Sequence, residues 1–250
     1  MLSTYHNKIK KYIVLKYCKE GDSLLNLTVG YDEDPQVWKE CKLSQIVGVD
    51  SNNSRIALAE SKNRSKYKEV QYFIGDSRAK LILSGVKKGY LFDLVTIFFD
   101  LEHFFEKEIY FKNMMNNASN NLKKGGYFIL TGFSGERINE VMVRNARIKG
   151  KNKANILWII EKNYNSKYNL NLPNFGKSIK ISYFRRYGFK EKMLVNMDYI
   201  VDVSSLYGLE LVELTPFKHY NNIVDHNMLL CKAELELSFY NDALIFRKKI

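Results

Sequence analysis

The sequence predicts an α/β fold with a doubly wound, mostly parallel sheet and an antiparallel edge strand. Short apolar runs typical of buried strands alternate with helical patterns between residues 23 and 131. The second run, QIVGVD, ends in Asp50, roughly 20 residues after the first strand-to-helix turn. The pair Gly125-Gly126 makes a turn into the fifth run, YFILT. This order and spacing is that of a nucleotide-binding α/β fold.

Each element of the predicted fold has its own signal in the sequence. Residues 5–18 form an amphipathic helical pattern with lysines opposite the apolar side chains. Residues 23–29 are continuously apolar, as in a parallel strand, and Pro35 suits the first turn of the next helix. The same reasoning predicts strands at 45–50, 70–74, 92–99, 127–131, 179–185, 192–197, 209–214 and 243–247, and helices at 54–63, 106–122 and 198–207.

The chain is predicted to form one domain of residues 1–250, because 46% of its residues are hydrophobic, which suffices for a full core. Residues 1–20 form its N-terminal basic helix. Residues 133–178 are predicted to be an inserted region exposed on the surface. This region is helical over 135–150 and is then rich in Asn, Lys and Tyr.

The composition excludes several classes of protein. No apolar run approaches the roughly 20 residues that span a bilayer, and the N-terminus is too basic for a secretory signal. Cys18, Cys41 and Cys231 are widely spaced and give neither a disulfide framework nor a metal signature. We therefore expect a soluble protein of a reducing compartment, with no membrane and no metal ion.

The net charge of +12 favours a polyanionic partner, of which nucleic acid is the commonest. Basic residues crowd the first 20 positions and the segments 144–153 and 177–192. An AT-rich coding sequence is the alternative explanation for so many Lys, Asn, Tyr and Ile residues.

Two acidic residues at strand ends are candidates for binding a nucleoside. Asp50 lies where a carboxylate accepts both hydroxyls of a ribose, and the alternative is a helix N-cap. Asp76, just after residues 70–74, can accept the exocyclic amino group of an adenine, with Ser77 assisting. A helix cap is again the alternative.

The first strand-to-helix turn, NLTVGYDED, argues against a dinucleotide or P-loop site. It keeps only Gly30, whereas a phosphate-binding loop needs several glycines. Asp32, Glu33 and Asp34 would repel a phosphate, but they are compatible with a cationic ligand such as S-adenosylmethionine. Solvated loop acids are the alternative interpretation.

No nucleophile with a neighbouring base is evident in the sequence. The four histidines lie in unrelated segments, and no Ser/His/Asp or Cys/His set occurs. This absence fits group transfer from an activated donor, in which positioning and electrostatics provide the catalysis.

Taken together, these segments resemble the mRNA cap guanine-N7 methyltransferases of eukaryotes and viruses, over nearly the whole chain from His6. The resemblance rests on HNKIKKYIVLKY, GDSLLNLTVGYDED, IVGVD, FIGDSRAK, FDLVTIFFDLEHFFE, NNLKKGGYFILTGF and MLVNMDYIVDVSSLYGLELVELTPF, with a terminal ALIFRKK. It implies a class I methyltransferase sheet, S-adenosylmethionine as methyl donor, capped RNA as acceptor and the nucleus as compartment, with the cytoplasm as the alternative.

The resemblance also implies roles for individual residues. Asp50 matches the acid that binds the donor's ribose, and Asp76 the acid beside its adenine. Lys10 matches a lysine that reaches the methionine carboxylate, and Asn7 and Lys62 match residues that contact the cap. The remaining positions that the resemblance places beside the donor are Thr28, Gly30, Phe98 and His103.

Several positions depart from the family pattern. The histidine that faces the guanine is replaced by Glu102, and the tyrosine beside the donor by His103. The guanine-binding glutamate aligns with Lys192, and lysine can only donate hydrogen bonds. A shift of one residue would bring in Glu191, but on the opposite face of the strand. Glu102 is one hypothesis for the substitute acceptor, and Asn26 and Thr28 alter the first motif.

Three functions therefore remain open at the level of sequence. The first is an active cap methyltransferase in which Glu102 and His103 position the reactants. The second is a catalytically degenerate methyltransferase-like subunit that binds RNA or a capping-enzyme partner. The third is a methyltransferase of different specificity.

Overall fold

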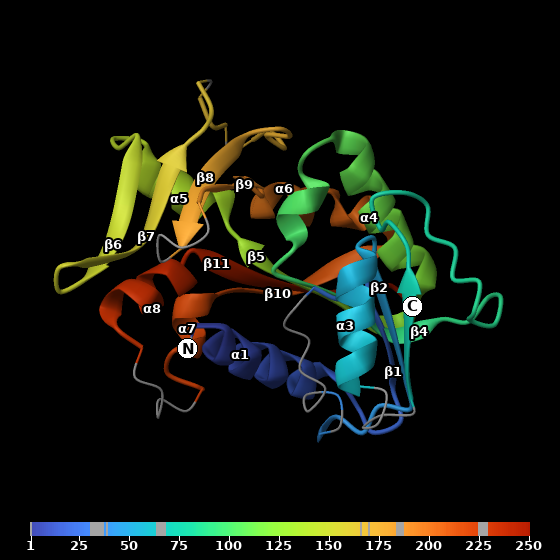
Figure 1. Cartoon of the computed structure of the whole chain (residues 1–250). Coiled ribbons are helices and arrows are strands. Elements are labelled where there is room, and N and C mark those ends of the chain that lie inside the picture. The colour runs from blue at the N-terminus through green and yellow to red at the C-terminus, as the bar shows by residue number, and fades with distance from the viewer. Residues whose placement is uncertain are drawn as a thin grey trace.

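The computed structural model contains two sheets, one of seven strands and one of four (Figure 1). The structure describes residues 2–30, 38, 40–63, 69–165, 167–169, 171–183, 188–224 and 230–250. The order of the large sheet is β10-β11-β5-β4-β1-β2-β3, and that of the small sheet is β6-β7-β8-β9. Among the described helices, none has the length and apolar character that a bilayer crossing requires.

The large sheet confirms the predicted doubly wound topology. Its parallel strands are β1 (Ser23–Asn26), β2 (Gln45–Asp50), β3 (Val70–Ile74), β4 (Phe92–Phe98) and β5 (Leu122–Phe133). The predicted antiparallel strand is β11 (Asn241–Lys248), which pairs with β5 on one side and with the edge strand β10 (Leu209–Pro216) on the other.

Helices cover both faces of the large sheet because its strands are apolar on both sides. Leu24 packs in the core beneath α1 (Leu2–Tyr17), whereas the next residue, Leu25, packs with α4 (Glu108–Asn121). The other helices are α3 (Asn53–Asn63), α5 (Gly135–Met142), α6 (Met197–Ser204), α7 (Phe217–Tyr220) and α8 (Lys232–Ser238), with short 3-10 helices η1 (Leu101–Phe104) and η2 (Ser205–Tyr207).

The inserted region differs from the sequence prediction. The helix predicted over 135–150 ends at Met142, and β6 (Arg147–Asn152) and β7 (Asn155–Lys162) follow it. With β8 (Ser178–Tyr183) and β9 (Lys190–Met193) they form the antiparallel small sheet (Figure 1). The segment expected to be exposed contains buried residues, because the run NILWII within it has strand-forming side chains that pack inward.

The small sheet shares an apolar cluster with β5, α5 and α8, and Trp158 is one of its links to the rest of the molecule. This indole is buried, and its Nε1 donates a hydrogen bond of 2.7 Å to the carbonyl oxygen of Ala233 on α8. Gly150 lies opposite Trp158 in the β6–β7 pair. A methyl group on Gly150 would lie 2.1 Å from Trp158 Nε1, so the sheet needs glycine here for close packing of the ring.

We expect Gly150→Ala to destabilise the protein, because the added carbon collides with the indole of Trp158. Overpacking of this kind costs about 1–3 kcal/mol, which corresponds to a fall in Tm of roughly 2–12 °C for a chain of this size. Thermal unfolding followed by circular dichroism measures the change, with the exposed neighbour Lys149→Ala as control. An unchanged Tm would show that the indole does not hold the small sheet in place.

Candidate functional site

Two cavities adjoin at the carboxyl edge of the large sheet, where open α/β folds bind their ligands. Their volumes are about 690 and 180 Å³. Arg55 and Asp100 line both, so the two cavities meet at this pair. The smaller cavity lies along the ends of β1 to β3, and the larger extends from the end of β4 to α1 and the small sheet.

Asp50 lies at the bottom of the smaller cavity, as the sequence predicts. Its Oδ2 accepts a hydrogen bond of 3.1 Å from the backbone N–H of Gly30, and its Oδ1 accepts one of 2.8 Å from that of Asn52. The N-cap role considered for Asp50 falls instead to Asn52, whose Oδ1 accepts from the N–H of Ser54 at 2.9 Å. The carboxylate of Asp50 therefore does not cap α3 and borders the smaller cavity.

Arg55 is a residue of this site that sequence reasoning missed. Its Nη1 lies 3.4 Å from Asp50 Oδ2 and 3.7 Å from Asp100 Oδ2, so the guanidinium bridges the two acids. The sequence contains one indication of its role, because Arg55 lies in the first turn of a helix. A positive charge there interacts unfavourably with the helix dipole and needs a nearby acid to compensate it.

Asp76 and Ser77 reach the smaller cavity, but both side chains already have partners. Arg78 binds the two oxygens of Asp76 at 3.0 Å each. Partial burial raises the pKa of Asp76, and the hydrogen bonds and charge of Arg78 outweigh this effect and lower it. Ser77 Oγ donates to the carbonyl oxygen of Leu27 at 2.7 Å, which ties it to the fold rather than to a ligand.

Thr28 lines the smaller cavity at a position where the family pattern has glycine. Its N–H donates to Asn26 Oδ1 at 3.2 Å. Its own Oγ1 is buried and makes no hydrogen bond to any described residue. A buried hydroxyl normally has a hydrogen-bond partner, so the Thr28 oxygen has unused hydrogen-bonding capacity among the described residues.

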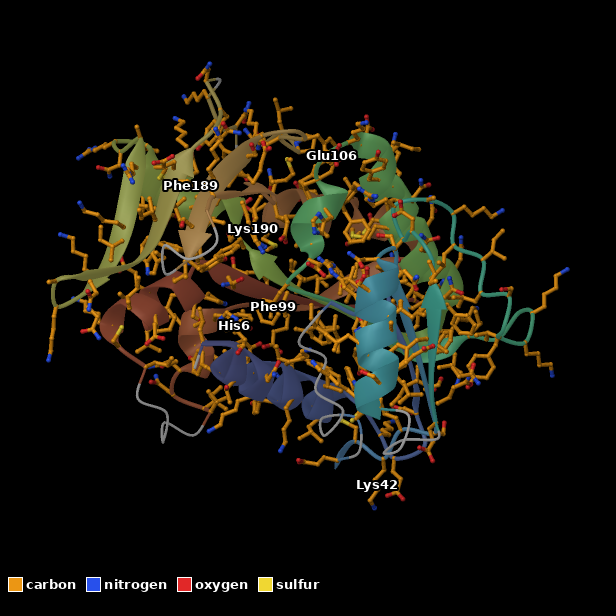
Figure 2. The ribbon with its side chains drawn as sticks, in the orientation of Figure 1. His6, Lys42, Phe99, Glu106, Phe189 and Lys190 are labelled. Carbon is orange, nitrogen blue, oxygen red and sulfur yellow. The ribbon has the colours of Figure 1, made fainter. Side chains whose placement is uncertain are left out.

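Helix α1 forms one wall of the larger cavity through Asn7, Lys10 and His6. Lys10 Nζ lies 5.0 Å from the centre of the Phe98 ring. The imidazole of His6 stacks on Phe99 with ring centres 4.6 Å apart, and both are labelled in Figure 2. Burial, together with the charge of Lys10, lowers the pKa of His6 to about 3, so this side chain is neutral.

The other wall carries Lys192 from β9, with Tyr183 and Phe133 beside it. Lys192 Nζ forms an ion pair and a hydrogen bond with Glu102. Burial lowers the pKa of Lys192, but the Glu102 carboxylate more than offsets this and raises it. Glu102 is only 3% exposed and is not part of the cavity wall. The ammonium of Lys192 is therefore the group presented to a ligand, which argues against Glu102 as the substitute acceptor.

Glu191 is turned away from the cavity, as expected for a neighbour in a strand. Its Oε1 accepts hydrogen bonds from Ser178 Oγ at 2.5 Å and from Asn163 Nδ2 at 2.9 Å. A one-residue shift of the alignment therefore does not restore a carboxylate at the cavity wall.

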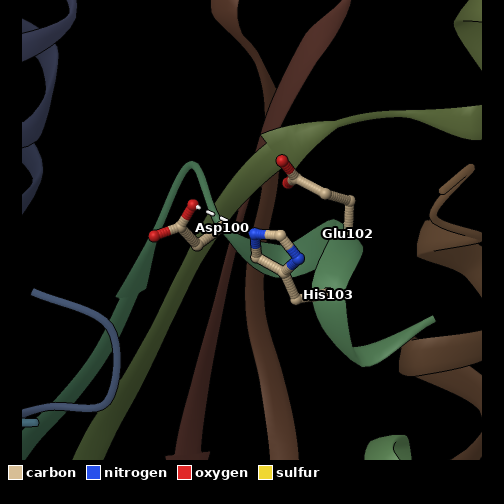
Figure 3. A group of neighbouring side chains, drawn as sticks. All are labelled: Asp100, Glu102 and His103. Atoms are coloured by element: carbon tan, nitrogen blue, oxygen red, sulfur yellow. Dashed lines mark ion pairs between the residues drawn. The ribbon is translucent and has the colours of Figure 1, made fainter. Parts of the chain in front are cut away.

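Asp100, Glu102 and His103 form a compact group after β4 (Figure 3). One ligand atom from each lies within 4.8 Å of the others. His103 Nε2 is 3.7 Å from Asp100 Oδ1, and burial, with the charge of Glu102, raises the pKa of Asp100. Arg55 and Lys192 already bring positive charge to these acids, and we assign no metal ion to the group.

Two predicted site residues, Lys62 and Glu102, line neither cavity. Glu102 is buried behind Lys192, whereas Lys62 lies far from both cavities. It is exposed in the last turn of α3, about 14 Å along the helix from the first turn at Asn53. The first-turn acids Asp32, Glu33 and Asp34 lie outside the described residues. The predicted residues that line the cavities are Asn7, Lys10, Thr28, Gly30, Asp50, Asp76, Phe98, His103 and Lys192.

The fold is that of the class I S-adenosylmethionine-dependent methyltransferases. One such enzyme from Clostridium acetobutylicum superposes with a TM-score of 0.62 at 16% identity, covering 100% of this chain and 93% of that one. A putative S-adenosylmethionine-dependent methyltransferase from Listeria monocytogenes gives 0.65 at 11% identity, covering 98% and 99%. At these identities the likeness establishes the fold.

Within this class, the chain belongs to the mRNA (guanine-N(7))-methyltransferase domain family, which its residues 1–235 match. It is 26% identical over 233 residues to an mRNA cap guanine-N(7) methyltransferase of Saccharomyces cerevisiae, covering 88% of this chain and 53% of that protein. It is 24% identical over 180 residues to a probable mRNA-capping enzyme of Acanthamoeba polyphaga mimivirus, covering 61% and 15%. The chain thus spans about half or less of these relatives.

We expect Lys192→Met to destabilise the protein strongly, because it leaves the buried carboxylate of Glu102 without its counter-ion. Breaking a buried ion pair in this way costs about 3–5 kcal/mol, whereas removing both charges is close to neutral. Denaturant unfolding of Lys192→Met, Glu102→Gln and the double variant forms a complete thermodynamic cycle. Additive effects of the two substitutions would contradict the pairing.

Proposed function

We propose that the chain is an mRNA cap guanine-N7 methyltransferase, which transfers a methyl group from S-adenosylmethionine to N7 of the guanosine that caps mRNA. The observation that carries this proposal is the junction of the two cavities at Arg55 and Asp100. A donor in one cavity and an acceptor in the other would meet there. Family membership supports this choice of reaction.

The smaller cavity fits the adenosine half of the donor. Asp50 would accept the ribose hydroxyls, and Thr28 Oγ1 would gain a hydrogen-bond partner, which none of the described residues provides. Asp76 would accept the adenine amino group with the oxygen lone pairs that Arg78 leaves. When bound, S-adenosylmethionine supplies a methyl group activated by the positive sulfur.

The methionine half would extend toward the larger cavity. Lys10 would reach its carboxylate from α1, beside the ring of Phe98. Asp100, at the junction, would face the cationic sulfur and ammonium groups. His103 borders the same junction from the adenosine side and would keep Asp100 oriented.

The larger cavity fits the capping guanosine. Its aromatic side chains Phe99, Phe133 and Tyr183 offer surfaces on which a purine can stack, and Asn7 adds a polar group. Guanine N7 is unprotonated and nucleophilic at neutral pH, so the reaction needs no general base. The protein's task is to align N7 with the methyl group, which requires orientation rather than proton transfer.

Exposed basic residues of the small sheet support binding of the RNA chain beyond the cap. Arg147, Lys149 and Lys151 lie on β6, Lys153 follows in the turn, and Lys180 lies on β8. These charges would contact phosphates without reading sequence. A nuclear location and a second capping-enzyme subunit remain predictions.

A catalytically degenerate subunit is the second candidate, and two observations favour it. Arg55 occupies the carboxylate that should bind the ribose, and Lys192 stands where the family has a guanine-binding acid. Such a subunit would bind RNA or a capping-enzyme partner without methylating a cap.

Methyl transfer to capped RNA, followed with labelled donor, tests the first candidate. The unmutated chain should methylate N7, and Asp50→Asn should weaken donor binding by about 2–4 kcal/mol, because two charge-assisted hydrogen bonds lose their charge. Asp93→Asn, which alters a carboxylate at the other end of the sheet, is the control. Donor binding without methylation of any capped RNA would instead favour the degenerate subunit.

Arg55→Met should make the protein prefer S-adenosylmethionine over S-adenosylhomocysteine more strongly. The substitution removes a positive charge near the donor's cationic sulfur and frees Asp50 and Asp100. An effect of about 1 kcal/mol, or roughly fivefold in the ratio of the two affinities, is expected for partly screened charges. Calorimetric titration measures both ligands, with Arg78→Met as control. An unchanged ratio would place the sulfur away from Arg55.

A further inference from the structure

One wall of the larger cavity carries the cation of Lys192, which is paired with Glu102. Lys192 and Tyr183 lie on the same face of the small sheet, since Ile179 pairs with Lys192 and the side chains of β8 at 179, 181 and 183 share one side. Both residues line the cavity. The ammonium of Lys192 also lies 5.6 Å from the centre of the Phe133 ring.

Glu102 fixes the direction of this ammonium. The side chain of Lys192 is 19% exposed and that of Glu102 is 4% exposed, so the carboxylate lies behind the lysine as seen from the cavity. One of the three N–H donors of Lys192 is used by Glu102. Two donors of Lys192 remain for a ligand, and the buried carboxylate of Glu102 does not line the cavity.

The ammonium of Lys192 can contact only hydrogen-bond acceptors, whereas the Tyr183 hydroxyl beside it can donate or accept. On guanine, O6 is an acceptor, whereas N1–H and the 2-amino group are donors. Among the described residues that line this cavity, Asp100 is the carboxylate, and its oxygens lie 3.7 Å from Arg55 and 3.7 Å from His103. Arg55 lines both cavities and His103 lines the smaller one, so these contacts engage the carboxylate at the junction.

We propose that Lys192, positioned by Glu102, recognises the acceptor guanine through O6 and that the N1–H and 2-amino edge is not read by a carboxylate. This inference rests on the proposed function and names the specificity determinant of its acceptor site. The pattern differs from an acid at position 192, which would bind N1–H and the 2-amino group and ignore O6.

The pairing with Glu102 also suits the charge that the reaction creates. The N7 lone pair forms the bond to the methyl carbon, the carbon–sulfur bond breaks, and its electron pair stays on sulfur. The positive charge therefore moves from sulfur to the guanine ring. An unpaired ammonium at O6 would repel the positive charge that develops on the ring, and the negative charge of Glu102 offsets this repulsion.

Cap dinucleotides with altered bases test the proposal on the unmutated chain. GpppA has O6, N1–H and the 2-amino group. Its inosine analogue lacks only the 2-amino group, and its 2-aminopurine analogue lacks O6 together with the N1 proton. A loss with the 2-aminopurine analogue is assigned to O6 only if it disappears when Lys192 is replaced. We expect the inosine analogue to be methylated nearly as well as GpppA. We expect kcat/KM for the 2-aminopurine analogue to fall about 10- to 100-fold, the factor for losing a hydrogen bond to a charged group.

Variants of the ion pair supply the second arm of the test. The double variant Lys192→Met with Glu102→Gln removes both charges and should lose the preference for O6. The exchange Lys192→Glu with Glu102→Lys should invert the preference, so that the inosine analogue becomes the poor substrate. Lys190→Met, on the same strand and exposed, is the matched control.

The role of Glu102 as a positioning residue has its own readout. Glu102→Gln should lower kcat more than it raises KM, because it leaves an uncompensated ammonium beside the ring that becomes positive. Glu102→Asp keeps the charge and should restore part of kcat. Equal effects on the two parameters in both variants would indicate a purely structural role and overturn this part of the proposal.

The outcomes separate this inference from the proposed function. Strong discrimination against the inosine analogue would overturn the inference, because a carboxylate would then read the amino edge. Equal kcat/KM for GpppA and its two analogues would also overturn it and would indicate that Lys192 binds the cap phosphates. Absence of methylation overturns the proposed function. In that case calorimetric binding of the same analogues, with S-adenosylhomocysteine present, still decides which edge is recognised.

Discussion

The sharp turn after β4 determines the arrangement of both cavities. Phe99 has a left-handed backbone with φ of 60°, which is strained for a bulky residue, and its N–H donates to the carbonyl oxygen of Thr131 at 2.9 Å. This turn directs Asp100 to the junction of the cavities and leads into η1, which carries Glu102 and His103. One local constraint thus places the groups that face the donor and those that hold the acceptor wall.

Paired charges distinguish this site from a simple binding pocket. Asp50 and Asp100 share Arg55, Asp76 binds Arg78, and Glu102 binds Lys192. A buried carboxylate is costly without a partner, so each cation stabilises the empty site. A ligand must then replace part of these ion pairs, and the pair with the longest N–O distances is the weakest. Arg55 lies 3.4 and 3.7 Å from its two carboxylates, whereas Arg78 lies 3.0 Å from Asp76, so we expect donor binding to displace Arg55 first.

The sequence predicts the large sheet well because local patterns and sheet topology agree. The position of Asp50 at the end of a strand was predictable, because the apolar run of β2 ends at this residue about 20 residues after the first strand-to-helix turn. The small sheet was not predicted, because its apolar residues are few among many Asn and Lys residues. The burial of Trp158 also depends on α8, which lies far away in the sequence. The Glu102–Lys192 pair joins residues 90 positions apart, and no local pattern reveals such a contact.

The two sheets divide the site into parts with different constraints. The large sheet supplies the strand ends around the smaller cavity, whose positions are fixed by the parallel core. The small sheet supplies Tyr183 and Lys192, which line the larger cavity, the acceptor site of the proposed function. A change on β8 or β9 can therefore alter the chemistry offered to the acceptor without disturbing Asp50 or Gly30. Lys192, which the family resemblance places where an acid is expected, would be such a change, and the Glu102 carboxylate offsets its charge.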